Sequence, residues 1–526
     1  MLAQNNHTSV LLSALRANVY FQVFLGCSFA WLLWRLWRFT IHPRLYPDEP
    51  KTYPYWIPFI GHSITFFRDA EETMQRARLY FNNTRDPFKL IIMGEIVYVI
   101  TSAQDTVSVY KNDAFSLNPW LMDLMRQFGA SDSSIRAMWS CVPDKPVKEI
   151  CVMLFRTLLN PGNYSEAMLD VLLSTVHTRM TWDQVPEWMV LSRPSAEGAD
   201  VSLLKWSQHV LLEGATRSFF GDALLEVEPN LFESFYEFDD SSWKLPYNIP
   251  DLFAQDVKRS KKTAEAALAR YFALPRSRRS DASKLVFEIE SVLRSGGIGN
   301  EDMGVLVLMF YWVINANAWK ASFWMLTHIL TNPSLHSAIL SELSPFITPT
   351  SPCTLSGPAL ATALQSHCPT LLAVYHEALR ISASSTSVRI VMSDTYIRNF
   401  KLLKGARMVI PYRQMMLDEG TYGADPASFQ HERFLQNPGL VKHPNYRPFG
   451  GGSSLCPGRA FAMKEILTFV GLAVGKFGVR LSEEAVRAGK EGRGVVPEMN
   501  TKTPCIGIMA PTGEGDVRVR IERPSW

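Results

Sequence analysis

Most of the chain beyond residue 65 carries apolar positions at the helical period, with few short stretches at the two-residue period of strands. Residues 88–101 form an apolar run interrupted near Gly94-Glu95, which predicts a β-hairpin that turns there. Residues 191–200 and 346–359 are rich in Ser, Pro, Thr and Gly, and we expect them to be surface loops. The pattern predicts a mainly α fold with a small β part.

One predicted helix is apolar on nearly every face. Asn300 can cap its start, and Asn332-Pro333 ends it. About thirty residues at the usual rise make a helix of about 45 Å. A helix of this kind is expected to run through the middle of the fold. Its polar interruptions, which need hydrogen-bond partners when buried, are Asn315, Asn317 and Ser322.

Near the N-terminus, residues 17–34 carry no charge and are mostly apolar, and with Leu36 and Trp37 the stretch can span a bilayer. The positive charges that follow it place the bulk of the protein in the cytosol, and they are Arg35, Arg38 and Arg44. A secretory signal peptide is the alternative, but no small-residue cleavage site follows.

We therefore expect a single-pass protein of the endoplasmic reticulum membrane. The expected parts are a short lumenal N-terminus (1–16), a transmembrane anchor (17–37), a proline-rich, non-helical connector (38–62) and one large catalytic domain (63–526). In this orientation Asn6, in the sequon Asn6-His7-Thr8, is lumenal and is a glycosylation candidate.

The composition excludes some classes of protein. A net charge of +3 in 526 residues, evenly spread, gives no basis for binding nucleic acid. The seven cysteines are odd in number and lack zinc-type pairing with histidines, so a reducing compartment is the simpler interpretation. At least one cysteine is then free for chemistry.

The strongest local signal surrounds Cys456, which follows Phe449 and a run of glycines and precedes Gly458. Glycines let the backbone turn with positive φ and approach a flat cofactor closely. The predicted helix from Arg459 to Val470 would direct backbone N–H groups at the sulfur and stabilise a thiolate. A glycine-rich loop around a structural cysteine is the alternative.

This segment resembles the heme-binding loop of the cytochrome P-450 superfamily, Phe-x-x-Gly-x-x-x-Cys-x-Gly, at Phe449, Gly452, Cys456 and Gly458. The resemblance implies the cytochrome P-450 fold, in a single large domain behind the transmembrane helix. It also implies heme b as the cofactor, with Cys456 as the axial ligand of its iron.

Two further segments resemble elements of the superfamily in the expected order. Glu377-Ala378-Leu379-Arg380 resembles its Glu-x-x-Arg pair, and residues 425–434 resemble the element that ends in Arg433-Phe434. The resemblance gives Glu377, Arg380 and Arg433 a structural role, in a network that braces the heme side of the core.

Within the superfamily the chain is similar to the group of sterol 7α-hydroxylase, sterol 12α-hydroxylase and prostacyclin synthase, through residues 382–389, Ala316-Asn317 and 456–459. The resemblance implies that Arg389 faces a heme propionate, since a guanidinium matches a carboxylate. A surface salt bridge is the alternative role of Arg389.

The chain also departs from these patterns. Ser454 replaces the usual arginine two residues before the cysteine, so one propionate contact is lost or supplied elsewhere. Arg136 and Lys148 are both candidates for the second propionate contact. Met416 stands where a histidine often occurs, and Lys320 takes the place of a proline in the closer group, which affects the register of the central helix.

The usual acid and threonine of the central helix are absent, and Asn317 stands there instead. An amide can order a water but cannot act as an acid. Either Asn317 and a water relay protons during oxygen activation, or the enzyme rearranges an already oxidised substrate. A third alternative is an asparagine satisfied by the backbone.

The leading functional hypothesis is a monooxygenase of secondary metabolite biosynthesis that oxidises a lipophilic steroid, terpenoid or other polycyclic natural product. NADPH-cytochrome P-450 reductase would supply the electrons and could dock on Lys442, Arg447 and Arg459, although these could equally form a plain solvated surface. A reductase-independent isomerase or dehydratase is the second hypothesis, and a non-catalytic heme-binding protein is the third. The expected pocket segments are 112–128, Phe310–Phe323, Ser384–Val388 and Cys505–Ile508.

Overall fold

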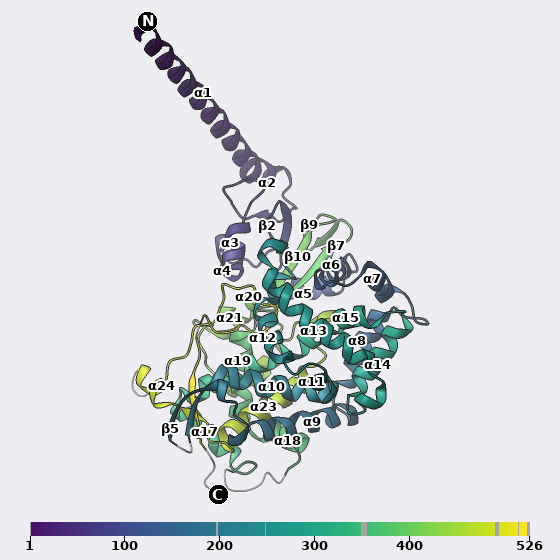
Figure 1. The fold of residues 1–526 in the computed structure, drawn as a ribbon. Helices are drawn as coiled ribbons and strands as arrows, with labels where there is room; N and C mark the ends of the chain where they lie inside the picture. The colour runs from purple at the N-terminus through teal and green to yellow at the C-terminus, as the bar shows by residue number, and fades with distance from the viewer. Residues whose placement is uncertain are drawn as a thin grey trace.

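The computed structural model describes residues 2–195, 198–247, 249–348, 355–489, 494–513 and 515–522, with side chains from residue 19 onward. A helical rod at the N-terminus leads into a mainly helical body, whose larger sheet lies near the rod (Figure 1). The predicted combination of a mainly α fold and a small β part is confirmed. Asn6, the glycosylation candidate, lies outside the described side chains.

The rod is longer than the predicted anchor. Helix α1 (Leu2–Leu36) continues through a π-helical turn (Trp37–Ile41) into α2 (His42–Leu45). Residues Val19–Leu45 are long and apolar enough to cross a membrane, and none of the most apolar window is buried in the protein. The prediction of a non-helical connector from residue 38 is thus wrong for its first eight residues. Pro43 is tolerated because it lies in the first turn of α2, where a backbone N–H has no helical partner.

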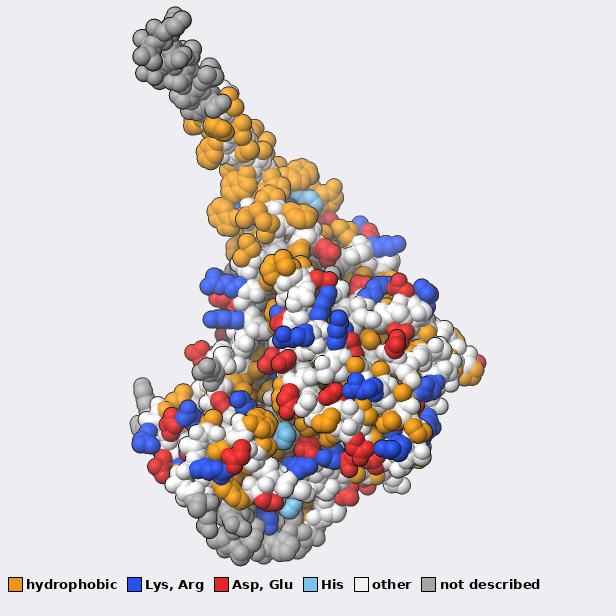
Figure 2. All heavy atoms as spheres, in the orientation of Figure 1, with side chains coloured by type: hydrophobic (Ala, Val, Ile, Leu, Met, Phe, Trp, Pro, Cys, Tyr) orange, Lys and Arg blue, Asp and Glu red, His pale blue; other side chains and the backbone are white. Residues whose placement is uncertain are grey.

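A small clamp of aromatic and cationic side chains joins the rod to the connector. The Trp31 and Trp56 rings stack with centroids 5.7 Å apart, and Trp31 Nε1 donates to the carbonyl of Trp56 at 2.8 Å. The Arg35 guanidinium lies 4.7 Å from the centroid of the Trp56 ring and donates to the carbonyl of Tyr55 at 3.0 Å. Hydrophobic side chains cover the described part of the rod and this junction (Figure 2).

The helices of the body are mostly of ordinary length. They are α3 (Ser63–Arg68), α4 (Ala70–Tyr80), α5 (Ala103–Tyr110), α6 (Asn118–Phe128), α7 (Asp132–Trp139), α8 (Val147–Leu158), α9 (Asn163–Arg179), α10 (Leu203–Phe220), α11 (Ala223–Val227), α12 (Leu231–Ser241), α13 (Gln255–Ala273), α14 (Lys284–Ser295), α15 (Asn300–Asn315), α16 (Ala318–Leu330), α17 (Pro333–Leu343), α18 (Gly357–His367), α19 (Pro369–Ser382), α20 (Tyr412–Met416), α21 (Glu419–Tyr422), α22 (Glu432–Gln436), α23 (Arg459–Gly475) and α24 (Glu483–Ala488).

The larger sheet has the strand order β1-β2-β3-β10-β7-β4. Its strands are β1 (Lys51–Thr52), β2 (Phe88–Ile92), β3 (Glu95–Val99), β10 (Arg407–Pro411), β7 (Thr386–Val391) and β4 (Phe115–Ser116). Strands β2 and β3 pair antiparallel around Met93-Gly94, so the predicted hairpin is confirmed. A separate two-stranded ribbon joins β8 (Thr395–Ile397) to β9 (Phe400–Leu402).

A second sheet corrects one of the predicted loops. Within residues 191–200, the structure contains most of β5 (Val190–Ser195) and the start of β6 (Gly198–Ser202). Strand β6 is wholly buried and pairs with β12 (Arg518–Glu522), which also pairs with β11 (Arg480–Leu481). A partner more than three hundred residues away leaves no trace in local composition. Of the second predicted loop, residues 349–354 lie outside the described residues, and α18 begins at Gly357.

The central helix is in the predicted place but is broken. Helix α16 packs against α10, α19 and α23, and its residues Phe323 and Trp324 are fully buried. The break falls at Ala316 and Asn317, between α15 and α16. At this break the Asn317 side chain accepts a hydrogen bond from the backbone N–H of the distant residue Ile508. Asparagine is disfavoured inside helices because its amide competes with the backbone hydrogen bonds of the helix. The prediction of one continuous helix is therefore wrong.

The predicted structural trio lies together in the interior. Arg380 donates to both Glu377 oxygens at 2.8 Å, and Arg433 Nη1 donates to Glu377 Oε1 at 2.6 Å. Glu377 and Arg380 are fully buried. Arg380 also donates to the carbonyls of Met416 and Pro426, which joins α19 to the chain segments that precede the Cys456 loop. The carboxylate therefore holds three separate segments in register.

We expect Glu377→Ala to lower the free energy of unfolding by about 3–5 kcal/mol, because it leaves buried guanidinium charge without its carboxylate. Urea denaturation followed by circular dichroism measures this. Glu72→Ala is the matched control, since the Glu72–Arg76 pair is solvent-exposed and should contribute less than about 1 kcal/mol. Equal losses in the two variants would contradict the prediction.

Candidate functional site

The loop that carries Cys456 is shaped by its glycines. Gly450 and Gly452 have φ of +75° and +57°, and a Cβ on Gly452 would overlap the ring of Tyr110. The Cys456 N–H donates to the carbonyl of Phe449 at 3.0 Å, which closes the loop. Gly458 then caps α23, the helix predicted from Arg459, which extends to Gly475. The sulfur is thereby placed at the start of a helix.

The environment of the Cys456 thiol has two opposing effects. Burial raises its pKa, whereas the backbone N–H groups of Gly458 and Arg459 and the Arg459 charge lower it. Without a positive partner the thiol keeps its proton at neutral pH. A metal cation in front of the sulfur would reverse this balance, because a coordinating thiol is deprotonated. The site suits a cationic partner on its open side.

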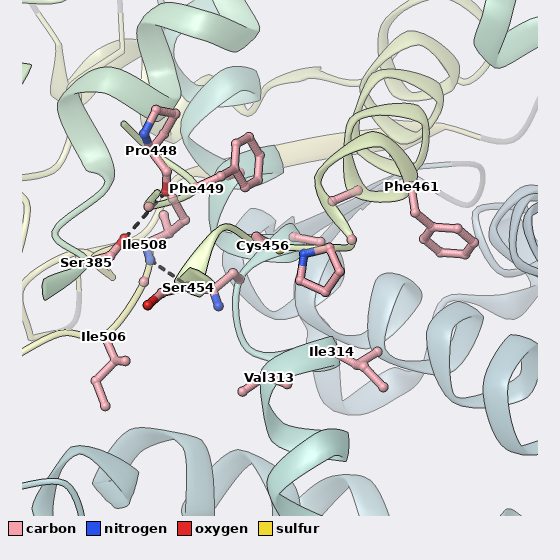
Figure 3. A pocket seen from close by; sticks show the side chains of 18 of the residues that line it. Val313, Ile314, Ser385, Pro448, Phe449, Ser454, Cys456, Phe461, Ile506 and Ile508 are labelled. Atoms are coloured by element: carbon pink, nitrogen blue, oxygen red, sulfur yellow. Dashed lines mark hydrogen bonds between the residues drawn. The ribbon is translucent and has the colours of Figure 1, made fainter. Parts of the chain in front are cut away.

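A cavity of about 490 Å³ lies in front of Cys456, between the cysteine loop and the broken central helix (Figure 3). All four predicted pocket segments contribute to its wall. The lining also includes residues that the sequence did not single out, namely Phe155, Leu159, Ala215, Phe219, Phe461, Ala462, Glu465 and Ile466. These come from α8, α10 and α23, which reach the cavity only through tertiary packing. Figure 3 shows Val313 and Ile314 on the helix that faces the cysteine loop.

Arg389 lies at one end of this site as a buried cation. Its guanidinium donates to Ser454 Oγ at 2.6 Å and to Ser387 Oγ at 2.7 Å, and the side chain is 3% exposed. It has no carboxylate partner among the described residues, so the alternative of a surface salt bridge is not supported. Burial lowers its pKa, and Tyr412 and Tyr110 act in the opposite direction. The structure places Ser454 in direct contact with Arg389.

A second guanidinium without a partner lies nearby. Arg447 Nε is buried and has no hydrogen-bond partner in the described part of the chain. A Cβ on Gly451 would lie 2.6 Å from Arg447 Nη1 and 2.9 Å from Tyr110, so the glycine leaves room for both. Tyr110 and Tyr412 are hydrogen-bonded through their hydroxyls. Sequence reasoning assigned Arg447 to a docking surface and missed both tyrosines.

The two other cationic candidates lie elsewhere. Arg136 is exposed on α7, and Lys148 donates to Asn118 Oδ1 at 2.8 Å with its ammonium 5.0 Å from the Trp139 ring centroid. Neither residue borders the cavity. Arg389 and Arg447 do not line the cavity either, but both bond residues that do, Arg389 through Ser454 Oγ and Arg447 through the Gly450 N–H, so they are the better cradle for two carboxylates.

Asn317 borders the cavity from the break in the central helix. Its Oδ1 accepts a hydrogen bond from the Ile508 N–H at 2.8 Å, which fixes the orientation of the amide. Its Nδ2 has no partner among the described residues and remains free to donate. The alternative that Asn317 is satisfied by the backbone is therefore correct for the amide oxygen but not for the amide nitrogen.

Glu465 is an acid that sequence reasoning missed. It lines the cavity from α23, is 5% exposed and forms no hydrogen bond or ion pair with the described residues. Burial raises the pKa of its carboxyl to about 8, so it holds a proton at neutral pH. A single carboxyl on the inward face of a helix that is otherwise apolar was the available signal.

The residues present fit a heme group. The thiol at a helix start, flat apolar walls, glycines without side chains and two guanidinium groups without acids match an iron, a porphyrin and two propionates. Among the described residues no group of three or more His, Cys, Asp or Glu could hold a metal ion directly.

Three comparisons with known proteins bear on this site. The family profile described as Cytochrome P450 matches residues 218–503. The cytochrome P450 monooxygenase poxD of Penicillium oxalicum is 24% identical over 444 residues, which are 81% of this chain and 86% of that protein. The prostacyclin synthase of Rattus norvegicus is 23% identical over 510 residues, which are 90% of this chain and 94% of that protein.

The fold also has a counterpart among solved structures. The retinoic acid-bound cyanobacterial CYP120A1 superposes with a TM-score of 0.66 at 16% identity, over 90% of this chain and 99% of that chain. At this identity the likeness establishes the fold alone.

Burial of Glu465 gives a prediction for the pH dependence of stability. Because its pKa is about 8 in the folded protein and near 4.5 when unfolded, its contribution is present below pH 4.5 and is lost as pH rises toward 8. Glu465→Gln should remove this slope and raise the free energy of unfolding at pH 8 by roughly 2–4 kcal/mol.

Urea denaturation between pH 5 and 9 measures the effect, with the exposed Glu166→Gln as the control. Parallel pH profiles for the wild type and Glu465→Gln would contradict it.

Proposed function

The chain belongs to the cytochrome P450 family, and on that basis we propose that it is a monooxygenase whose heme iron is bound by Cys456. It is an oxidoreductase that works with heme. The observation that carries the proposal is the Cys456 thiol, held at the start of α23 in front of an apolar cavity. When bound, the heme supplies an iron centre that activates O2 and inserts one oxygen atom into the substrate.

The chain's own residues prepare the site for this group. Cys456 provides the thiolate, which pushes electron density toward iron. Phe449, Gly452 and Gly458 shape the loop, and the glycines admit the flat ring without steric conflict. Arg389 and Arg447 would pair with the two propionates, with Tyr110 between them. One propionate contact is missing because Ser454 replaces the usual arginine. In this assignment Arg389 and Arg447 together would provide both contacts.

Two groups in the cavity can handle protons. Glu465 holds a proton at its carboxyl at neutral pH. Asn317 Nδ2 can donate a hydrogen bond to a water but cannot release a proton. We assign Asn317 to ordering a water in the cavity and Glu465 to keeping a proton available there.

The substrate that suits this cavity is lipophilic. The heme would take up most of the cavity of about 490 Å³, so the substrate would lie along the central helix, where the lining side chains Val313, Ile314 and Ala318 are apolar. A steroid, terpenoid or other polycyclic natural product is the class we propose, in keeping with a role in secondary metabolism.

The electrons would come from NADPH-cytochrome P450 reductase at the outer side of the cysteine loop. A surface hollow there is bordered by Arg156 and Arg459, and Arg156 donates to the carbonyl of Ser453 at 2.9 Å. Lys442 adds a further exposed charge on the segment that precedes the loop, whereas Arg447 is turned inward. Basic side chains at this position suit an acidic flavoprotein.

A membrane location follows from the rod. Residues Val19–Leu45 are long enough to anchor the protein, and the arginines after the apolar stretch favour a cytosolic catalytic body on the endoplasmic reticulum. An anchored body takes lipophilic substrates from the bilayer.

We expect the reduced, CO-bound protein to show the red-shifted Soret band of thiolate ligation. Cys456→Ala should abolish this band, because no other described cysteine lines the cavity in front of the loop. Absorbance spectroscopy measures it, with the exposed Cys141→Ala as the control. A band that survives in Cys456→Ala would overturn the ligand assignment.

Turnover distinguishes a monooxygenase from an isomerase. Candidate lipids are incubated with the purified protein, with and without reductase, NADPH and O2, and the products are analysed by mass spectrometry. Oxygen incorporation that requires reductase supports the proposal, whereas rearrangement without reductase supports an isomerase. Asn317→Ala should slow product formation roughly tenfold and raise peroxide release, whereas the exposed Asn230→Ala should not. No change in either quantity would contradict the role of Asn317.

A further inference from the structure

A second cavity of about 680 Å³ lies beside the one in front of Cys456. The two cavities share Val313, Asn317 and the segment Ile506–Ile508 as lining. We call the second cavity the polar chamber. Its remaining wall comes from α10, α12, the start of α16 and the segment from Asn500 to Gly513. The polar chamber has no part in the chemistry described above.

The partition between the cavities is thin. It consists of the Asn317 amide, hydrogen-bonded to the Ile508 N–H at 2.8 Å, and of Gly507. A Cβ on Gly507 would overlap Asn317 Oδ1, so the two groups are in direct contact. Val313 is 58% exposed although it belongs to the central helix, which shows that open space surrounds it. A molecule in front of Cys456 therefore has the polar chamber as its neighbour.

A buried ion pair stands at the inner wall of the polar chamber. Lys320 Nζ donates to Asp239 Oδ2 at 2.9 Å, and Trp312 Nε1 donates to Asp239 Oδ1 at 3.1 Å. The Asp239 side chain is 3% exposed and that of Lys320 is 14% exposed. The pair explains how a lysine can replace a proline near the start of α16, because Asp239 of α12 neutralises it. The net charge of the Lys320–Asp239 pair is zero.

The polar chamber also offers hydrogen-bonding groups without partners. An ammonium has three donors, and Lys320 uses one of them on Asp239. The Trp319 indole N–H has no partner among the described residues, and that side chain is 4% exposed. Asp240, beside Asp239, has no hydrogen bond or ion pair in the described part of the chain. The two remaining donors of Lys320 therefore favour an occupant that carries a hydrogen-bond acceptor.

Resting on the function proposed above, we propose that the polar chamber binds the oxygen-bearing end of the substrate, a hydroxyl or carbonyl, while its apolar body lies beside Val313, on the central-helix side of the first cavity. Lys320 donates to that oxygen and is a specificity-determining residue. A neutral oxygen suits the balanced charge of the Lys320–Asp239 pair better than a free carboxylate or amine does. A hydrocarbon end would leave the donors unpaired and would be rejected.

The test uses probes that need no knowledge of the natural substrate. Two 1-alkylimidazoles with equal chain length, one ending in a methyl and the other in a hydroxyl group, bind heme iron through the imidazole. Absorbance titration of the resting protein gives a Kd for each probe without turnover. A series of chain lengths locates the tail that reaches the polar chamber.

At that chain length we expect Lys320→Met to raise the Kd of the hydroxyl probe about tenfold relative to that of the methyl probe, because one charged hydrogen bond is lost. The exposed Lys258→Met on α13 is the control and should leave the ratio of the two Kd values unchanged. Because Lys320→Met leaves Asp239 unpaired, the double variant Lys320→Met with Asp239→Asn tests the same ratio without a buried lone charge.

The outcomes separate the two proposals. Spectral shifts with both probes, and an equal ratio at every chain length in the wild type, Lys320→Met and the double variant, would overturn the role of the polar chamber alone. The absence of a shift with either probe would overturn the heme-thiolate function and the polar chamber with it.

Discussion

The site depends on one buried carboxylate. Glu377 accepts from Arg380 and Arg433, and through them it joins α19 to the segments that lead to the cysteine loop. A charge this deep is stable only with complete pairing, so the network permits one arrangement of these segments. The position of the Cys456 sulfur is a consequence of that arrangement. The network touches no substrate, yet every wall of the cavity is placed relative to it.

Local chemistry made part of the molecule predictable. The hairpin and the helix from Arg459 follow from short patterns with strong backbone preferences, whereas the order of the Glu377, Arg433 and Cys456 segments was predicted from the resemblance to the superfamily. The break at Asn317 was hidden because its cause, the N–H of Ile508, lies 191 residues away in the chain. The strand β6 was mistaken for a loop for the same reason, since its partner β12 is also distant.

Prediction of the site residues from the sequence was limited for the same reason. The sequence identified Cys456 through the glycine-rich loop around it, and Arg389 through the resemblance to the sterol hydroxylase and prostacyclin synthase group. Glu465 matters because tertiary packing brings it to the cavity without a partner, and Tyr110 and Arg447 matter because packing brings them against the glycines of the cysteine loop. Buried polar atoms without a partner occur in many places in the described part of the chain, and among them only Trp319 belongs to the lining of either cavity, so burial without a partner does not by itself mark the site. A pattern of spacing cannot reveal which polar group has been left unpaired.

Gly507 and Asn317 are distant in the sequence but in direct contact in the structure. Because any side chain at Gly507 would collide with the Asn317 amide, residue 507 can change only where residue 317 is smaller than asparagine. A protein that keeps Asn317 and Gly507 keeps a partition one amide thick between the two cavities. A protein that loses the pair divides its interior differently and can accept substrates of another shape.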